Sequence, residues 1–217
     1  MSHVIAIDGP SGSGKSSTSR GVARALGFAY LDTGAMYRAM AWAMAERGID
    51  VGDGEAVAHA APSVVLVSGT DPDAPTITAD GVDVSEAIRT PEVTALTSPV
   101  ATVPSVRTQL VDLQRAAIAA NPQGIVVEGR DIGMVVAPDA ELKIWLVADP
   151  VARAKRRAAE IGDEDPAAIA EAMALRDKID STRKASPLTQ PEDAVVVDGT
   201  NLSLDEVIAK IVGLASA

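Results

Sequence analysis

The stretch GPSGSGKS, residues 9–16, constrains this chain more than any other segment. It follows a short apolar run at 4–7 and opens a segment at 15–26 that has helical character. Glycines at this spacing, between a strand and a helix, let successive backbone N–H groups turn around a phosphate, and the helix N-terminus adds partial positive charge. The stretch therefore predicts a nucleoside triphosphate site. Lys15 is expected to reach the β- and γ-phosphates, and the Ser16 hydroxyl to ligate Mg²⁺.

The alternative for this loop is a glycine-rich strand–helix turn that binds no ligand. The full spacing in this position favours a phosphate site over that alternative. The loop residues predicted to contact ATP are Gly9, Pro10, Ser11, Gly12, Ser13, Gly14, Lys15, Ser16 and Ser17. The loop does not say which molecule receives the phosphoryl group.

Apolar runs of strand length alternate with helical segments along the chain, which predicts an α/β fold with a parallel sheet covered on both faces. The predicted strands lie at 4–7, 28–31, 125–127, 142–147 and 194–197, and the predicted helices at 15–26, 34–46 and about 103–117. We expect a three-layer fold of the P-loop NTPase type, with a five-stranded sheet and one domain over 1–217. Short strands at 64–67, 77–79 and 82–84 indicate a small β-rich insert at about 62–100.

Composition excludes several classes of protein. The 217 residues include no cysteine and only two histidines, so disulfides, thiolate metal sites and ordinary histidine-based triads are absent. A net charge of −11 with 2% aromatic residues argues against a nucleic-acid surface. No apolar run approaches the roughly 20 residues that span a bilayer, and the N-terminus does not resemble a signal peptide. We therefore expect a cytoplasmic protein that binds neither nucleic acid nor a membrane.

Arginines recur just beyond the predicted strands. LDTGAMYR contains Arg38, VEGRDIG contains Arg130 and RDKIDSTR contains Arg176 and Arg183. Each alone is more often a solvated surface residue. Because the carboxyl ends of parallel strands meet at one edge of the sheet, Arg38 and Arg130 are expected beside the phosphate loop, which favours an anion site.

These segments also carry a family resemblance. The chain resembles bacterial cytidylate (CMP) kinase over nearly its whole length, through IAIDGPSGSGKS, LDTGAMYR, DVSEAIRTPEV, VEGRDIGMVVAPDA, RDKIDSTRKASPL and VVVDGT. The second, fourth and fifth of these motifs are far more specific than a phosphate loop alone. The resemblance implies transfer of the γ-phosphoryl group of ATP to CMP, and to dCMP, with Mg²⁺. It also implies a monomer whose β-rich insert moves with the monophosphate site.

The resemblance assigns roles to individual residues. It implies that Arg38, Arg130 and Arg183 hold the 5′-phosphate of CMP and, with Lys15, form the catalytic set. Asp180 is expected to bond the ribose hydroxyls and to fix a neighbouring arginine. Residues expected to read cytosine or otherwise bind CMP are Thr33, Ser98, Arg107 and Asp131.

The chain departs from the family pattern in its predicted helical lid, at about 153–183. Ile179 stands where many members have arginine, and the segment 160–166 is short. Four lid arginines are therefore alternatives for contacting the triphosphate: Arg153, Arg156, Arg157 and Arg176. Arg153 and Arg157 are four residues apart, which places them on one helical face, and this pair is the prediction.

Phosphoryl transfer to CMP needs no general base, because the attacking atom is already an anionic phosphate oxygen. Catalysis then consists of aligning and neutralising two polyanions, a task for which arginine forks are suited. Asp32 and Glu128 are expected to act on Mg²⁺ through water; anchoring a neighbour or capping a helix is the alternative role. Asp131 would accept a hydrogen bond from the N4 amine of cytosine and repel O4 of uracil, while Arg107 and Ser98 donate.

Three other functions stay open. A P-loop kinase that phosphorylates a hydroxyl, such as a sugar or shikimate kinase, would need a base, and Asp32 is available for it. UMP or dTMP as the main acceptor is a smaller change within the same class. A nucleotide-dependent switch is the third alternative, although the chain lacks the N-K-x-D that reads guanine.

Overall fold

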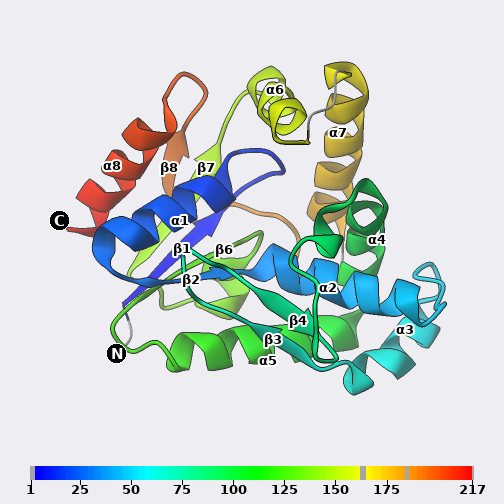
Figure 1. Cartoon of the computed structure of the whole chain (residues 1–217). Coiled ribbons are helices and arrows are strands. Elements are labelled where there is room, and N and C mark those ends of the chain that lie inside the picture. The colour runs from blue at the N-terminus through cyan, green and yellow to red at the C-terminus, as the bar shows by residue number, and fades with distance from the viewer. Residues whose placement is uncertain (1–2, 162–164, 184–185, 217) are drawn as a thin grey trace.

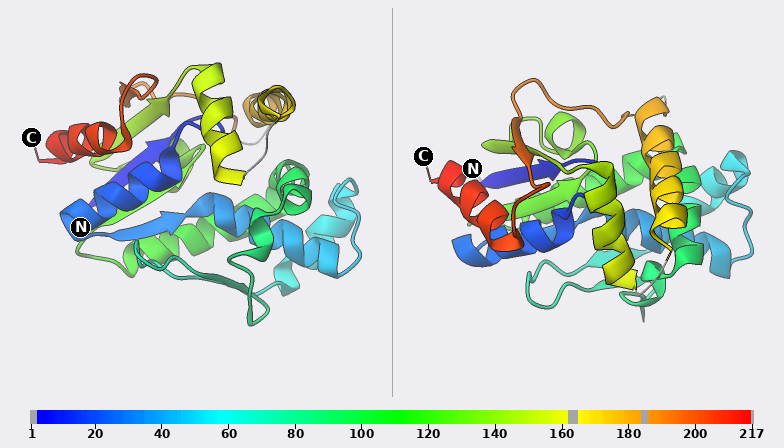
Figure 2. Two further views of the ribbon diagram at one scale, coloured as in Figure 1. Left: turned by 45° about the horizontal axis from the view of Figure 1, so that its top comes forward. Right: turned by 90° about the horizontal axis from the view of Figure 1, so that it is seen from above.

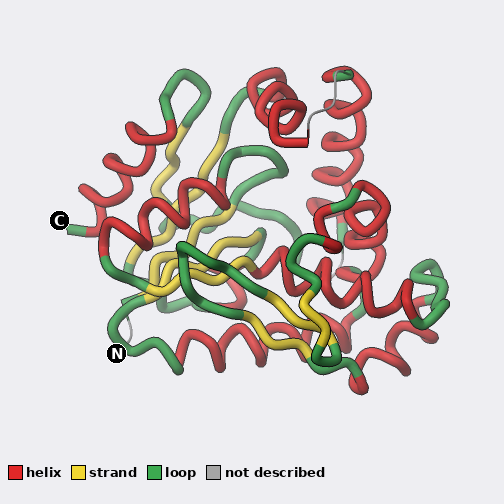
Figure 3. Tube along the Cα trace, in the orientation of Figure 1, coloured by secondary structure: helices red, strands yellow, loops and turns green. Residues whose placement is uncertain are grey.

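The computed structural model describes residues 3–161, 165–183 and 186–216. Its centre is a five-stranded parallel sheet in the order β2-β6-β1-β7-β8, which confirms the predicted α/β class (Figures 1 and 3). The strands of this sheet are β1 (Val4–Asp8), β2 (Ala29–Asp32), β6 (Ile125–Gly129), β7 (Leu142–Val147) and β8 (Val195–Asp198). The helices are α1 (Lys15–Leu26), α2 (Thr33–Glu46), α3 (Gly54–Ala60), α4 (Pro91–Ala101), α5 (Pro104–Ala119), α6 (Pro150–Ile161), α7 (Pro166–Thr182) and α8 (Leu204–Ala215).

The sheet is buried on both faces, as its continuous apolar strands predict. Alternate residues of β1 enter different cores: Ile5 and Ile7 pack with α1 and α8, whereas Val4 and Ala6 pack with the elements on the other face. That second core, the larger one, also contains α2 and α5. Both chain ends lie at the end of the molecule opposite α4 and α7 (Figure 2).

The β-rich segment forms a second sheet of three antiparallel strands, β3 (Leu66–Ser68), β4 (Ile77–Ala79) and β5 (Val82–Asp83). Asp80 and Gly81 both have positive φ, 51° and 82°, as a tight hairpin turn between β4 and β5 requires. The loop between β3 and β4 is tied to α1: Arg20 Nε donates to Pro72 O at 2.8 Å and Arg24 Nε to Asp73 Oδ1 at 2.6 Å. The insert is thus attached to the helix that begins at the phosphate loop.

Some elements lie outside the sequence-based expectation. Helices α3, α4 and α8 were not predicted, and α4 contains Pro99 in its interior, where proline removes a hydrogen bond and usually ends a helix. A π-helix at Ile132–Val136, directly after β6, also had no local signal. The predicted lid corresponds to α6 and α7, and its residues 162–164 lie outside the described residues. Of the helices described, none has the length and apolar character to cross a membrane.

The strand register aligns the carboxyl ends of three strands. Asp8 at the end of β1 pairs with Gly129 of β6, and Asp32 at the end of β2 pairs with Glu128. Asp8 is buried and accepts two backbone hydrogen bonds, from Ile132 N at 2.9 Å and Gly133 N at 2.8 Å. It therefore fixes the turn after β6 against the strand that leads into the phosphate loop.

The packing of α5 against the sheet leads to one prediction about stability. Leu110 of α5 is fully buried, so Leu110→Ala removes apolar contacts and leaves a cavity, at a cost of about 3 kcal/mol in the free energy of unfolding. Urea denaturation would measure this loss. Asp112→Ala, an exposed position on the same helix, should change stability little. Equal effects of the two substitutions would contradict the described packing of α5.

A second prediction concerns Asp8 and pH. Burial raises the pKa of this carboxyl from 3.8 to about 6, although its two N–H donors act in the opposite direction. Because the folded state then binds the proton more tightly than the unfolded chain, the contribution of Asp8 to stability increases as pH falls from 7 through 6. Asp8→Asn should remove this contribution, so wild type should gain more stability than the variant between pH 7 and pH 5. Identical pH dependence in the two proteins, measured by urea denaturation, would contradict it.

Candidate active site

The phosphate loop has the backbone that its sequence predicts. Gly9, Gly12 and Gly14 all have φ in the left-handed range, at 153°, 68° and 91°. A Cβ on Gly9 would lie 2.1 Å from Leu146 O, so only glycine fits between the loop and β7. Gly14 precedes α1 and offers no side chain to cap it, which leaves the N–H groups of the first turn available to an anion.

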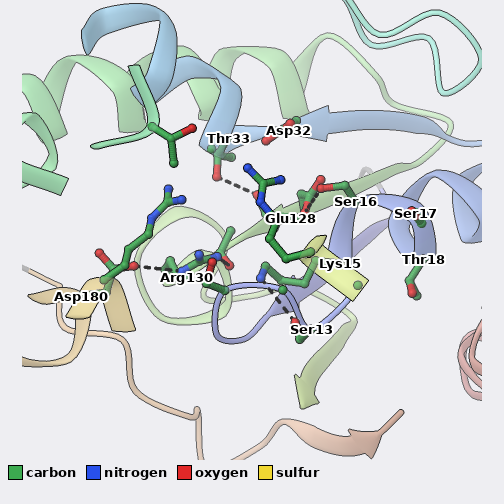
Figure 4. A pocket seen from close by; sticks show the side chains of 18 of the residues that line it. Ser13, Lys15, Ser16, Ser17, Thr18, Asp32, Thr33, Glu128, Arg130 and Asp180 are labelled. Carbon is green, nitrogen blue, oxygen red and sulfur yellow. Dashed lines mark hydrogen bonds and ion pairs between the residues drawn. The ribbon is translucent and has the colours of Figure 1, made fainter. Parts of the chain in front are cut away.

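Lys15 is buried at the start of α1, and its Nζ donates to Pro10 O at 2.7 Å within the loop itself. Burial lowers the pKa of this ammonium, and the nearby Arg130 lowers it further. A polyphosphate would supply the negative charge that this buried cation lacks. Lys15 and Ser16 lie on the phosphate-loop side of the pocket, across from Arg130 and Asp180 (Figure 4).

Glu128 is a buried carboxylate at the end of β6. The Ser16 hydroxyl donates to its Oε2 at 3.1 Å, and the Tyr30 hydroxyl donates to its Oε1. Burial raises the pKa of Glu128, and the charge of Asp32 adds to the effect. Glu128 therefore anchors the Ser16 side chain in this structure.

At the carboxyl end of β2, Asp32 holds Arg38. Asp32 caps α2 by accepting Ala35 N at 2.8 Å, and its other oxygen accepts Arg38 NH2 at 2.9 Å. Thr33 Oγ1 donates to Glu128 O at 2.7 Å, which joins the ends of β2 and β6. Asp32 therefore caps α2, and the same carboxylate orients Arg38 toward the pocket.

The remaining arginines are held by carboxylates from two other elements. Arg130 Nε donates to Asp180 Oδ2 of α7 at 3.1 Å. Asp131 is hydrogen-bonded to Arg107 of α5, and the Arg183 guanidinium lies 3.8 Å from Asp131 and 3.9 Å from Asp180. Side chains from the segments 107, 130–131 and 180–183 thus form one alternating cluster of charges.

These groups surround one pocket of about 920 Å³. Besides the phosphate loop and the strand ends, its lining includes Ser98 of α4, which is buried, and Arg156, Arg157 and Arg176 of the lid helices. Leu202, Ser203 and Leu204 line it as well, although no sequence motif singled them out. Arg107 lies behind the lining, buried against Asp131.

Within the described residues, several buried guanidinium nitrogens in this cluster have no hydrogen-bond partner: Arg38 Nε, Arg107 NH1, Arg176 Nε and Arg183 NH2. Burial lowers the pKa of Arg176 to about 10, with the charge of Arg130 as the next cause. Burial and the nearby Arg107 likewise lower that of Arg183. Unsatisfied donors of one sign, crowded in a pocket, indicate a site for an anionic ligand with several acceptor oxygens.

Of the predicted site residues, Gly9, Pro10, Arg107 and Arg153 do not line this pocket. Arg157 lines the pocket, whereas Arg153 of α6 is turned toward Asp177 of α7, with an NH1–Oδ2 distance of 2.6 Å, and does not line it. The spacing of four residues places both arginines on one face of α6. The way α6 packs on its neighbours determines which groups each arginine contacts. The lid arginines that line the pocket in this structure are Arg156, Arg157 and Arg176, and contact of Arg153 and Arg157 with the triphosphate stays a prediction.

The pocket thus has two cationic ends. One is the glycine loop with Lys15 and the open first turn of α1; the other is the arginine–carboxylate cluster around Arg130. Such an arrangement can hold two phosphorylated groups with their charges neutralised, and a phosphoryl group can pass between them if they are aligned.

Comparison with known proteins shows which family this chain resembles. The family model described as cytidylate kinase matches residues 5–217. The chain is 57% identical over 211 residues to a cytidylate kinase from Streptomyces griseus, covering 97% of this chain and 91% of that protein. It is 50% identical over 210 residues to one from Mycolicibacterium paratuberculosis, covering 94% of this chain and 91% of the relative.

Among solved structures, a gluconokinase from Sinorhizobium meliloti has the same fold, with a TM-score of 0.53 and 15% identity over 98% of this chain and 91% of its own. An uncharacterised protein from Eubacterium ventriosum has a TM-score of 0.55 at 11% identity, covering 100% and 99%. At these identities the likeness concerns the fold alone. The family match over residues 5–217 and the identities of 50% and 57% establish that this chain belongs to the cytidylate kinase family.

Proposed function

We propose that this chain transfers the γ-phosphoryl group of ATP to CMP and dCMP, producing ADP and CDP or dCDP, by holding the two nucleotides end to end in the pocket. Membership of the family supports the reaction. The observation that supports the arrangement is the convergence of Arg38, Arg130, Arg176 and Arg183 on the pocket that contains the phosphate loop. Arg38, Arg176 and Arg183 each have a buried guanidinium nitrogen without a hydrogen-bond partner.

The arginines bind and orient the acceptor phosphate, while the loop and Lys15 hold the donor phosphates. Lys15 must exchange its bond to Pro10 O for a phosphate oxygen when the donor binds, and this relieves the cost of its burial. No proton is removed from the acceptor, because its attacking oxygen is already anionic at neutral pH. Neither of the two histidines lines the pocket among the described residues, in keeping with a reaction that needs no base.

The residues present fit a Mg²⁺ ion held mainly by substrate phosphates. Within the described residues no group of three or more histidine, cysteine, aspartate or glutamate side chains is placed to hold a metal by itself. The donors at this place are hard oxygens, the Ser16 hydroxyl beside the Glu128 carboxylate, which suit Mg²⁺. When bound, the ion would neutralise charge on the β- and γ-phosphates, with Ser16 as its protein ligand and Glu128 and Asp32 acting through water.

Base recognition is proposed for the Arg107–Asp131 pair and Ser98. Arg107 holds Asp131 from behind and packs over the Tyr37 ring at 5.5 Å, so the carboxylate is fixed. A fixed carboxylate accepts from the N4 amine of cytosine and repels O4 of uracil, while the Ser98 hydroxyl is available as a donor. Selection of the base would then follow from hydrogen-bond polarity.

A coupled assay of ADP formation with ATP and each acceptor in turn tests the proposal. CMP and dCMP should be the most efficient acceptors, and UMP, dTMP, shikimate and simple sugars should be poor ones. A faster reaction with a hydroxyl acceptor would overturn the assignment of the acceptor. ATP hydrolysis without any acceptor dependence would favour a nucleotide switch instead.

The base assignment gives a sharper prediction. Asp131→Asn should lower kcat/KM for CMP relative to that for UMP, by about 1–3 kcal/mol, as for one polar contact in a buried site. The ratio between the two substrates matters, because Asp131 also contacts Arg183, and a general loss of phosphate binding would lower both values. Asp139→Asn, an exposed position outside the pocket, is the control. Equal losses for CMP and UMP would refute the assignment.

A further inference from the structure

Two lid helices bind the backbone of the phosphate loop at a single residue, Ser11. Ser11 N donates to Asp177 Oδ1 of α7 at 2.9 Å, and Ser11 O accepts Arg153 NH1 of α6 at 2.8 Å. Arg153 and Asp177 are themselves paired at 2.6 Å, and their side chains are only 13% and 18% exposed. We call this triangle of Ser11, Arg153 and Asp177 the clasp.

Apolar contacts lie beside the clasp. A Cβ on Gly12, whose φ is 68°, would lie 2.4 Å from Met173 Cε and 3.2 Å from Arg153 O. The lid helices therefore lie close to the loop, and a side chain at position 12 would require Met173 to move. Met173 belongs to the small core that joins α6 to α7, together with Ala158 and Ile169. The two helices thus rest on the loop as one packed unit.

Helix α7 also reaches the other end of the pocket. Asp180 lies three residues after Asp177, on nearly the same helical face, and pairs with Arg130. Arg176, which lines the pocket, is the neighbour of Asp177 in the sequence. Fixing Asp177 on the phosphate loop therefore sets the position of the α7 side chains that face the acceptor phosphate.

Electrostatic repulsion explains why the Asp177 carboxylate is paired with Arg153. An unpaired Asp177 next to the phosphate loop would repel an incoming polyphosphate, whereas the adjacent Arg153 neutralises it. The carboxylate can then bond the loop backbone without opposing the donor nucleotide.

We propose that Asp177 and Arg153 are positioning residues: their clasp holds the α6–α7 lid on the phosphate loop and so couples the donor site to the acceptor arginines. This inference rests on the proposed function for its kinetic consequence. It gives Arg153 a different task from direct contact with ATP.

Three variants distinguish the two tasks: Asp177→Asn, Arg153→Met and the double variant. Arg153→Met leaves an uncompensated carboxylate at the loop, so KM for ATP should rise about tenfold, the size of one lost charged hydrogen bond. Adding Asp177→Asn removes that charge, and KM for ATP should then fall back toward the value of Asp177→Asn alone. If the double variant is as impaired as Arg153→Met or more so, Arg153 acts on ATP directly and the inference is overturned.

Hydrogen exchange provides a readout that does not depend on the acceptor. In the ligand-free protein, Asp177→Ala should speed exchange of the amides of residues 9–14 and of α7 by about tenfold, because Ser11 N loses its acceptor and the lid its attachment. Asp177→Asn retains an acceptor oxygen and should show a smaller change. Glu171→Gln, which neutralises an exposed carboxylate on the same helix, is the matched control.

Unchanged exchange in Asp177→Ala, or an equal change in Glu171→Gln, would overturn the clasp even if CMP proves to be the acceptor. Conversely, faster exchange confined to the loop and α7 supports the clasp even if wild type prefers another acceptor. The two proposals therefore fail separately.

Discussion

Guanidinium groups held close together repel one another, and the site is organised around the relief of that repulsion. Asp131 lies between Arg107 and Arg183, and Asp180 between Arg130 and Arg183. The relief is incomplete, because burial and neighbouring arginines still lower the pKa of Arg176 and Arg183. A phosphorylated ligand completes it. The ligand-free pocket is thus a partly neutralised cluster that becomes more favourable when an anion enters.

The sheet is what allows the cluster to exist. Parallel strands bring their carboxyl ends to one level, so that Asp8, Asp32 and Gly129 lie in neighbouring register although they are far apart in the chain. Each end then continues into a different functional segment: the phosphate loop, the helix with Arg38, or the turn with Arg130. Asp8 locks the third segment to the first through two backbone hydrogen bonds. The same contacts therefore stabilise the fold and position the site, and the buried Asp8 carboxylate makes two of them.

The features that could be predicted from the sequence are those signalled by short local patterns. The phosphate loop, the five strands of the central sheet and the arginines after the strand ends all carry signals within about ten residues. Helix α4 lacked such a signal because Pro99 stands in its interior, and the π-helix after β6 because tertiary bonds to Asp8 shape its first turn. The ion pair between Arg153 and Asp177 could not be predicted from the sequence for a related reason. Spacing places a residue on a face of its own helix, but the neighbouring helix determines what that face meets.

Helix α7 links the two halves of the site by simple geometry. Successive residues of a helix project about 100° apart, so Arg176 and Asp177 necessarily point in different directions. One lines the pocket among the acceptor arginines and the other bonds the phosphate loop, which requires the helix axis to pass between the two sites. A rigid element in that position cannot approach one substrate without approaching the other. In the proposed reaction, enclosure of the donor and alignment of the acceptor would then occur together, which would keep water from the donor phosphate.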